Sequence, residues 1–138
     1  MYLRKCLLIK IIITQTHFYI YVYKLSYIDN LDEMEERNIR WCFHGHTHIP
    51  HVYYRSKHTD HDSNEEKQIL KDYQHALICP GSIGQPRNMQ PGAQIAFIDL
   101  ENEELELHNI SYDMTSLLND MKKFDFPEQL ISRLIKGQ

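Results

Sequence analysis

The feature that most constrains the fold is one change in the spacing of the apolar residues, close to residue 112. Before it, short apolar segments rich in β-branched and aromatic residues alternate with turn-forming segments, a pattern typical of strands. After it, apolar residues recur three and four positions apart, which is the spacing of one helix face. Strands followed by terminal helices predict a sheet packed against helices, so we expect an α/β or α+β fold.

The expected elements follow from these periods and from the Gly, Pro and charged residues between them. Strands are expected over residues 9–23, 39–43, 51–54, 76–79, 94–100 and 105–109, the last two forming a hairpin. A short helix capped by Asp29 is expected over 29–38, one capped by Asp113 extends to Phe124, and one begins at Pro127 and ends at Gly137. The helix that begins at Pro127 is expected to bury Leu130, Ile131, Leu134 and Ile135. Residues 56–72, polar and charged, are expected to form a flexible surface insertion.

Length and composition exclude several classes of protein. The 138 residues fit a single domain with a core of its own. A net charge of -4 lacks the basic footprint that nucleic-acid backbones require. Three widely separated cysteines argue against a disulfide framework, so we expect a cytoplasmic protein. Lys10, Gln15 and His17 interrupt the apolar N-terminal segment, which favours a buried strand over a membrane span or a signal peptide.

The candidate metal ligands stand in residues 44–50, directly after an expected strand. The motif is Gly45-His46-Thr47-His48. Two imidazoles one residue apart can face a common point if the backbone turns between them, and Gly45 permits such a turn. Neutral imidazole ligates first-row metals, and two metals about 3.5–4 Å apart can clamp a phosphoryl oxygen. The alternative is that these histidines line one face of an extended strand.

A second loop, with the sequence Pro-Gly-Ser-Ile-Gly-Gln-Pro-Arg at residues 80–87, favours the metal site over histidines that merely line a strand. Together with Gly45-His46-Thr47-His48, the strand at 94–100 and the pair Tyr112-Asp113, it resembles the calcineurin-like metallophosphoesterases, in particular their small bacterial and archaeal phosphodiesterase branch. The resemblance runs from about residue 17 or 25 to residue 137. It implies the C-terminal part of a two-sheet β-sandwich flanked by helices.

The resemblance also implies roles for individual residues. His46 is expected to ligate one metal of a pair and His48 the other. His17 is expected to be either a further ligand or a buried core histidine, because Phe18 follows it where the family has Gly or Ser. The implied cofactor is a pair of divalent ions, manganese first, with zinc, iron and nickel as alternatives.

The implied substrate is a small phosphoester, and no membrane partner is expected. Ser82 and Arg87 are the candidate substrate-binding residues, since the 80–87 loop shapes the rim of the family's site. Arg87 either pairs with a phosphate oxygen or bonds carbonyls of its own loop. No residue is assigned as catalytic, because metal-activated water is the nucleophile in this family.

Three front-half motifs of the family are absent from the sequence: Asp-x-His, Gly-Asp-x-x-Asp, and Gly-Asn-His followed by Asp or Glu. They supply the carboxylate that holds the two cations together and the acid that protonates the leaving group. Three functions therefore stay open. They are metal-dependent phosphodiester hydrolysis, an inactive N-terminally truncated fragment, which is favoured for the chain alone, and a partial metal-binding module completed by a partner chain.

A fragment of such a sandwich is expected to expose sheet surface that the front half would cover. We therefore predict that the isolated chain forms homo-oligomers, aggregates or is marginally stable. Size-exclusion chromatography with light scattering, followed by a thermal melt, tests this. A monomer that unfolds in one cooperative transition at high temperature would contradict the prediction.

Overall fold

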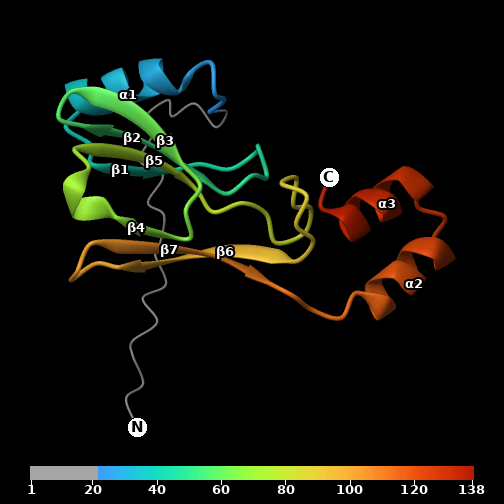
Figure 1. Ribbon diagram of the computed structural model, residues 1–138. Helices are drawn as coiled ribbons and strands as arrows, with labels where there is room; N and C mark the ends of the chain where they lie inside the picture. The colour runs from blue at the N-terminus through green and yellow to red at the C-terminus, as the bar shows by residue number, and fades with distance from the viewer. Residues whose placement is uncertain (1–21) are drawn as a thin grey trace, which may run out of the picture.

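The computed structural model describes residues 22–138, and it contains two packed sheets and three α-helices in that range (Figure 1). The expected mixed α/β class is confirmed. His17 and nearly all of the strand expected over 9–23 lie outside the described residues. Of that strand only Val22 and Tyr23 are described; they are not in a strand, and Val22 is buried.

The first sheet has the order β1-β5-β2-β3. Its strands are β1 (Trp41–Phe43), β5 (His75–Cys79), β2 (His51–Ser56) and β3 (Thr59–Ser63). β1 and β5 are parallel, whereas β5 with β2 and β2 with β3 are antiparallel.

The second sheet is antiparallel and has the order β4-β7-β6. Its strands are β4 (Lys67–Ile69), β7 (Glu104–Ile110) and β6 (Ala93–Asp99). The predicted hairpin is confirmed, with Ile98 opposite Leu105. Leu105 and Leu107 are buried while Glu104 and Glu106 are partly exposed, which is the alternation that the sequence predicted for this strand.

The main core lies between the two sheets. Val52 and Ile78 of the first sheet pack with Leu105 and Leu107 of the second, and Leu70 of the short 3-10 helix η1 (Leu70–Asp72) completes the cluster. Each such side chain contributes about 1.5–3 kcal/mol when it leaves water. The sheets are therefore held together mainly by aliphatic burial.

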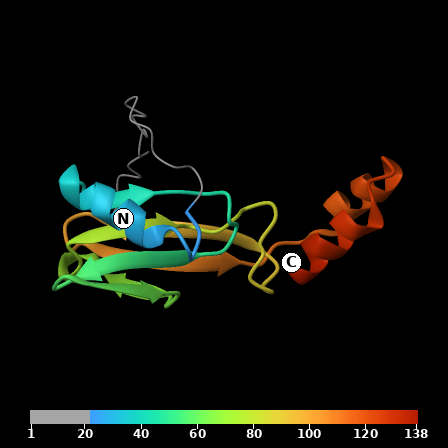
Figure 2. The same cartoon turned by 90° about the horizontal axis from the view of Figure 1, so that it is seen from above.

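Helix α1 (Tyr27–Glu36) covers the opposite face of the first sheet (Figure 2). Its buried residues Leu31 and Met34 pack with Tyr53 of β2 and Leu77 of β5. β5 is thus covered on both faces and is buried at all five positions, which explains why residues 76–79 are all apolar. The predicted cap Asp29 is wrong, because the helix begins two residues earlier and Asp29 lies in its first turn.

Arg55 of β2 fastens α1 to the β2–β3 hairpin. Its guanidinium donates hydrogen bonds to Asp60 of β3 at 2.6 Å, to Glu35 of α1 at 2.6 Å and to Asp32 of α1 at 2.7 Å. The side chain is only 9% exposed. These acceptors, Asp60 first, raise the pKa of Arg55. One planar cation therefore joins two strands and a helix.

Helices α2 (Thr115–Lys123) and α3 (Glu128–Lys136) lie beyond one end of the sheets (Figures 1 and 2). The residue before α2 is Met114 and not the predicted cap Asp113, although Asp113 accepts a hydrogen bond from the Thr115 N–H at 2.9 Å. The C-terminal Gly137 has a φ of 69° and accepts a hydrogen bond from the Met89 N–H at 2.7 Å. None of the helices in the described part of the chain is long and apolar enough to cross a membrane.

The predicted burial of α3 is largely wrong, because of Leu130, Ile131, Leu134 and Ile135 only Leu134 is buried. Leu117, Phe124 and Ile135 are 42%, 66% and 50% exposed, and of the apolar residues in the two helices only Leu134 is buried. The helical period does reflect a one-sided apolar face, but that face does not lie over either sheet (Figure 2).

Residues 56–72 contain β3, β4 and η1 and supply strands to both sheets. Gln68 and Leu70 are buried. β3 is polar because it is an edge strand whose side chains are mostly exposed, and polar residues there disfavour pairing with other chains. The flexibility of this segment stays a prediction.

We predict that Arg55→Ala lowers the free energy of unfolding by about 1–3 kcal/mol, because it leaves grouped carboxylates without their cation, although two of these are half exposed. Urea denaturation measures the change. The matched control is Arg40→Ala, which removes an exposed ion pair with Glu103 and should have a much smaller effect. Equal destabilisation by the two variants would contradict the anchoring role of Arg55.

Candidate functional site

The parallel pairing of β1 with β5 brings the two sequence motifs together. Phe43 and Ile78 are register partners, so both strands end at the same edge of the sheet. The His44 N–H donates to the Ile78 carbonyl at 3.0 Å, and the loop from residue 44 to 50 starts beside the loop from residue 80. The carboxyl ends of parallel strands are the usual place for a ligand site.

The backbone turns sharply at the two predicted metal ligands. The Thr47 N–H donates to the Gly45 carbonyl at 2.9 Å, and His46 between them has a φ of 73°, which is the rarer form of γ-turn. His48 also has a positive φ, 59°. A positive φ costs a non-glycine residue about 1–3 kcal/mol where it is strained, and such residues concentrate at functional sites.

The turn was expected at Gly45, and this expectation is wrong. Gly45 is not among the residues with positive φ, and a Cβ added to it would have no neighbour within 4 Å. His46 and His48 make the turn themselves. The bare backbone of Gly45 instead leaves open space beside the histidines.

His48 is held by the neighbouring loop. Its Nδ1 lies 2.8 Å from the Gln85 carbonyl oxygen, and its own carbonyl accepts a hydrogen bond from the Arg87 N–H at 3.0 Å. Because a carbonyl can only accept, Nδ1 carries the proton in the neutral ring, and Nε2 keeps its lone pair. A backbone acceptor on the second ring nitrogen is the usual partner of a metal-ligating histidine.

His46 faces Tyr23. Its Nε2 lies 2.8 Å from the Tyr23 hydroxyl, and the two rings meet edge to face with centroids 5.9 Å apart. A cation bound at Nε2 would have to displace this hydroxyl.

Both histidines line a cavity of about 470 Å³, which we call the histidine pocket. Its other lining residues come from the 80–83 loop and the start of β6: Pro80, Gly81, Ser82, Ile83, Gln94, Ile95 and Ala96. The structure thus brings His46, His48 and Ser82 to one cavity. Arg87 is not among the lining residues, and His17 lies outside the described residues.

Buried Gln94 shapes the 80–87 loop, and the sequence analysis assigned it no role. Its Oε1 accepts a hydrogen bond from the Ser82 N–H at 2.9 Å, and its backbone N–H donates to the Ser82 carbonyl at 3.0 Å. Gly81 has a φ of 93°, and a Cβ there would collide with the Gln94 side chain. The sequence did contain a signal for this role, because Gln94 is a polar amide at the start of a mostly apolar strand.

The polar groups of Ser82 and Arg87 have partners within the loop. The Ser82 Oγ accepts a hydrogen bond from the Gln85 N–H at 2.9 Å, and an Arg87 Nη2 donates to the Gln85 side-chain oxygen at 3.3 Å. The Arg87 side chain is exposed. Both residues therefore help to shape the loop.

His44 is a further candidate that the sequence analysis set aside. Its Nδ1 lies 3.3 Å from the Gly45 carbonyl, while its buried Nε2 has no hydrogen-bond partner. Burial lowers the pKa of His44, so that the ring stays neutral at lower pH than usual. Even so, no group of three or more His, Cys, Asp or Glu side chains among residues 22–138 is arranged to hold a metal ion.

Comparison with known proteins places this geometry in context. No protein-family model matches the chain. The uncharacterized protein MJ0912 of Methanocaldococcus jannaschii is 33% identical over 96 residues, covering 70% of this chain and 39% of that protein. A metallophosphoesterase from Sphaerobacter thermophilus superposes with a TM-score of 0.63 at 28% identity, covering 71% of this chain and 42% of that one.

The hypothetical protein PH1004 of Pyrococcus horikoshii shares the fold, with a TM-score of 0.58 at 19% identity over 84% of this chain and 39% of that one. This chain spans about two fifths of the length of the proteins it matches, between 39% and 42%. The predicted resemblance to the metallophosphoesterases is therefore confirmed, in a mixed α/β, two-sheet fold that the chain shares with a protein of that family.

Proposed function

We propose that this chain forms part of a metal-dependent phosphoesterase site, in which His46 and His48 ligate divalent cations and the substrate is a phosphodiester. The observation that carries the proposal is the bond from His48 Nδ1 to the Gln85 carbonyl, which leaves Nε2 available as a ligand at the wall of a cavity. The likeness to the metallophosphoesterase of Sphaerobacter thermophilus supports the same assignment.

The described residues fit one part of such a centre. Imidazole nitrogens suit first-row divalent metals, and the open space at Gly45 lets a ligand approach the backbone. They include no carboxylate that could join the two histidines in a metal site. The proposal therefore requires further ligands from outside residues 22–138, and His17 is the candidate within this sequence.

A bound divalent cation would polarise a phosphoryl oxygen and activate water at neutral pH. The chain's own residues would position the substrate. Ser82 accepts one hydrogen bond at Oγ from Gln85, so its hydroxyl proton remains for a phosphate oxygen. Arg87 is the exposed last residue of the same loop, and its guanidinium can neutralise the charge of a substrate phosphate. We propose Mn²⁺ as the working cation, with Zn²⁺, Fe²⁺ and Ni²⁺ as alternatives.

A second candidate function is metal binding without turnover, by an inactive fragment or by a module that a partner chain completes. It is favoured by the absence of a complete ligand group among the described residues and of the family's aspartate motifs in the sequence. The two candidates differ in one measurable property, which is hydrolysis by the isolated chain.

We predict that the purified chain binds Mn²⁺ in isothermal titration calorimetry and that His46→Ala or His48→Ala weakens binding at least about tenfold. The matched control is His61→Ala, which removes an exposed histidine of β3 and should leave the affinity unchanged. If the folded chain binds none of the four cations, the proposal is wrong.

The same samples with Mn²⁺ are then tested for hydrolysis of bis(p-nitrophenyl) phosphate. Turnover that both alanine variants lose, and that His61→Ala keeps, is the expected result for a phosphoesterase site. Metal binding without turnover would instead select the second candidate function.

A further prediction concerns the Tyr23 hydroxyl, which forms a hydrogen bond with His46 Nε2. Removing it by Tyr23→Phe should strengthen Mn²⁺ binding about two- to tenfold, since the cation no longer competes with a hydrogen bond. Tyr112→Phe, at an exposed tyrosine, is the control. An unchanged affinity in Tyr23→Phe would contradict ligation through this nitrogen.

A further inference from the structure

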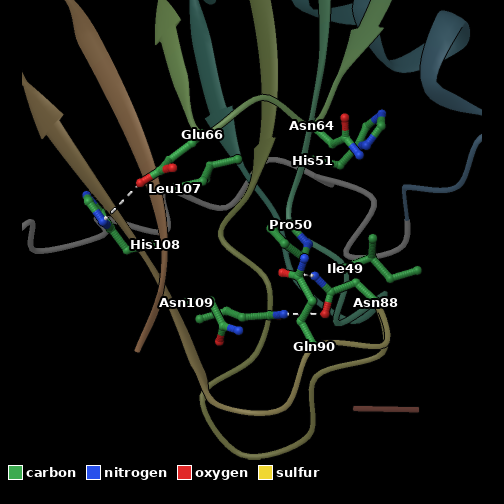
Figure 3. Close-up of a pocket in the computed structure, with 11 residues that line it drawn as sticks. Ile49, Pro50, His51, Asn64, Glu66, Asn88, Gln90, Leu107, His108 and Asn109 are labelled. Atoms are coloured by element: carbon green, nitrogen blue, oxygen red, sulfur yellow. Dashed lines mark hydrogen bonds and ion pairs between the residues drawn. The ribbon is translucent and has the colours of Figure 1, made fainter. Parts of the chain in front are cut away.

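A second cavity, of about 420 Å³, shares the lining residue Gln94 with the histidine pocket and is drawn in Figure 3. We call it the amide cavity. Its walls come from the segments before β2, before β4 and before β6, and from β7: Ile49, Pro50, His51, Asn64, Glu66, Asn88, Gln90, Gln94, Leu107, His108 and Asn109. Cavities of roughly 300–1,000 Å³ hold small organic ligands.

The chemistry of its walls is unusual for a gap between two sheets. Five carboxamide side chains and two imidazoles line it, while Glu66 is the one lining residue with a full charge. A carboxamide offers both donors and acceptors, so these walls can match hydroxyl groups, which also do both. Lys and Arg, the usual partners of phosphate and carboxylate, are missing from the lining, which argues for a neutral ligand.

The lining also argues against a flat heterocycle. Nucleobases are usually held by stacking on Phe, Tyr or Trp, and the lining contains none of these. Its apolar part consists of Ile49, Pro50 and Leu107. Such a patch suits the C–H face of a sugar ring.

A chain of hydrogen bonds orients the amides before any ligand arrives. The Ser82 N–H donates to Gln94 Oε1, so that Gln94 Nε2 can donate to Asn88 Oδ1 at 2.5 Å. Asn88 Nδ2 in turn donates to Gln90 Oε1 at 3.2 Å, as the dashed lines between these side chains indicate in Figure 3. This leaves the Gln90 amino group for a ligand, and preorganised polar groups bind at lower entropic cost.

Other lining groups have unused hydrogen-bonding capacity. The Asn64 side chain makes no hydrogen bond within the described part of the chain, and it lies next to His51 in Figure 3. The buried His51 Nε2 lies 3.4 Å from Asp62 Oδ2, with which it forms an ion pair when the ring is protonated.

We propose that the amide cavity is a binding site for a neutral sugar of mono- or disaccharide size, with Asn64 and Gln90 as hydrogen-bonding partners of its hydroxyls. Glu66 faces the same space beside His108, from which it is 3.8 Å away, and accepts from further hydroxyls. This site does not depend on metal binding by His46 and His48.

Saturation-transfer NMR on the purified chain tests the proposal with glucose, galactose, mannose, ribose and maltose as separate probes. Adenosine is the comparison, because saturation of its base protons reports binding of a flat heterocycle. We expect saturable binding of at least one of these sugars in the millimolar range or tighter. The double variant Asn64→Ala, Gln90→Ala should weaken it at least about fivefold. Asn119→Ala, Gln129→Ala is the matched control, since it removes the same two side-chain types from exposed positions of α2 and α3.

Circular dichroism and a thermal melt establish that each variant is folded. The proposal is overturned if no sugar saturates the folded chain, if binding is equal in the two double variants, or if adenosine binds through its base more tightly than any sugar. Because the readout is binding without metal, a failure here leaves the phosphoesterase proposal untouched, and the reverse also holds.

Discussion

The parallel pairing of β1 with β5 is the constraint on which the rest of the structure depends. These two strands are far apart in the sequence, and their pairing places two loops at one edge of the sheet. Hydrogen bonds then join the loops directly, from His48 to Gln85 and from Arg87 to His48. If β5 ran the other way, residues 80–87 would leave the opposite edge and could not support the histidines.

Burial on both faces makes this pairing stable. Ile78 of β5 packs against the second sheet, whereas Leu77 packs against α1. Both faces of β5 are therefore buried. Arg55 adds a polar restraint by joining α1 to the β2–β3 hairpin through charged hydrogen bonds. The two sheets and α1 thus form the packed layers of the chain, and the loops of the site extend from them.

Gln94 links the two cavities. It is almost completely buried, lines both of them, and satisfies its amide through Ser82 on one side and Asn88 on the other. A buried amide with both ends paired rigidifies its surroundings, whereas an apolar replacement would leave the Ser82 N–H without its partner. The shape of the 80–87 loop therefore rests on a residue outside the motif that identified it.

Much of the fold could be predicted from local patterns. The alternation at Leu105 and Leu107 indicated a strand with one buried face, and Gly137 indicated a helix end. The motif at His46 and His48 together with the 80–87 loop indicated the resemblance to the metallophosphoesterases, because the two motifs in this combination are more specific than either alone. The roles of His17, Ser82 and Arg87 stay predictions.

Other features depend on contacts between distant residues and could not be predicted from the sequence. The turn at residues 45–48 was assigned to Gly45 because glycine tolerates a positive φ. Instead His46 and His48 have positive φ, and hydrogen bonds from the neighbouring loop hold His48 there. The polar sequence of β3 did not indicate a strand. It forms one because its backbone pairs with β2, and this pairing does not depend on apolar side chains. The sequence by itself determined which residues form strands, helices and motifs, through periods that depend on local geometry. The tertiary structure decided which motifs meet and which helix faces remain exposed, because these depend on pairing and packing between segments far apart in the chain.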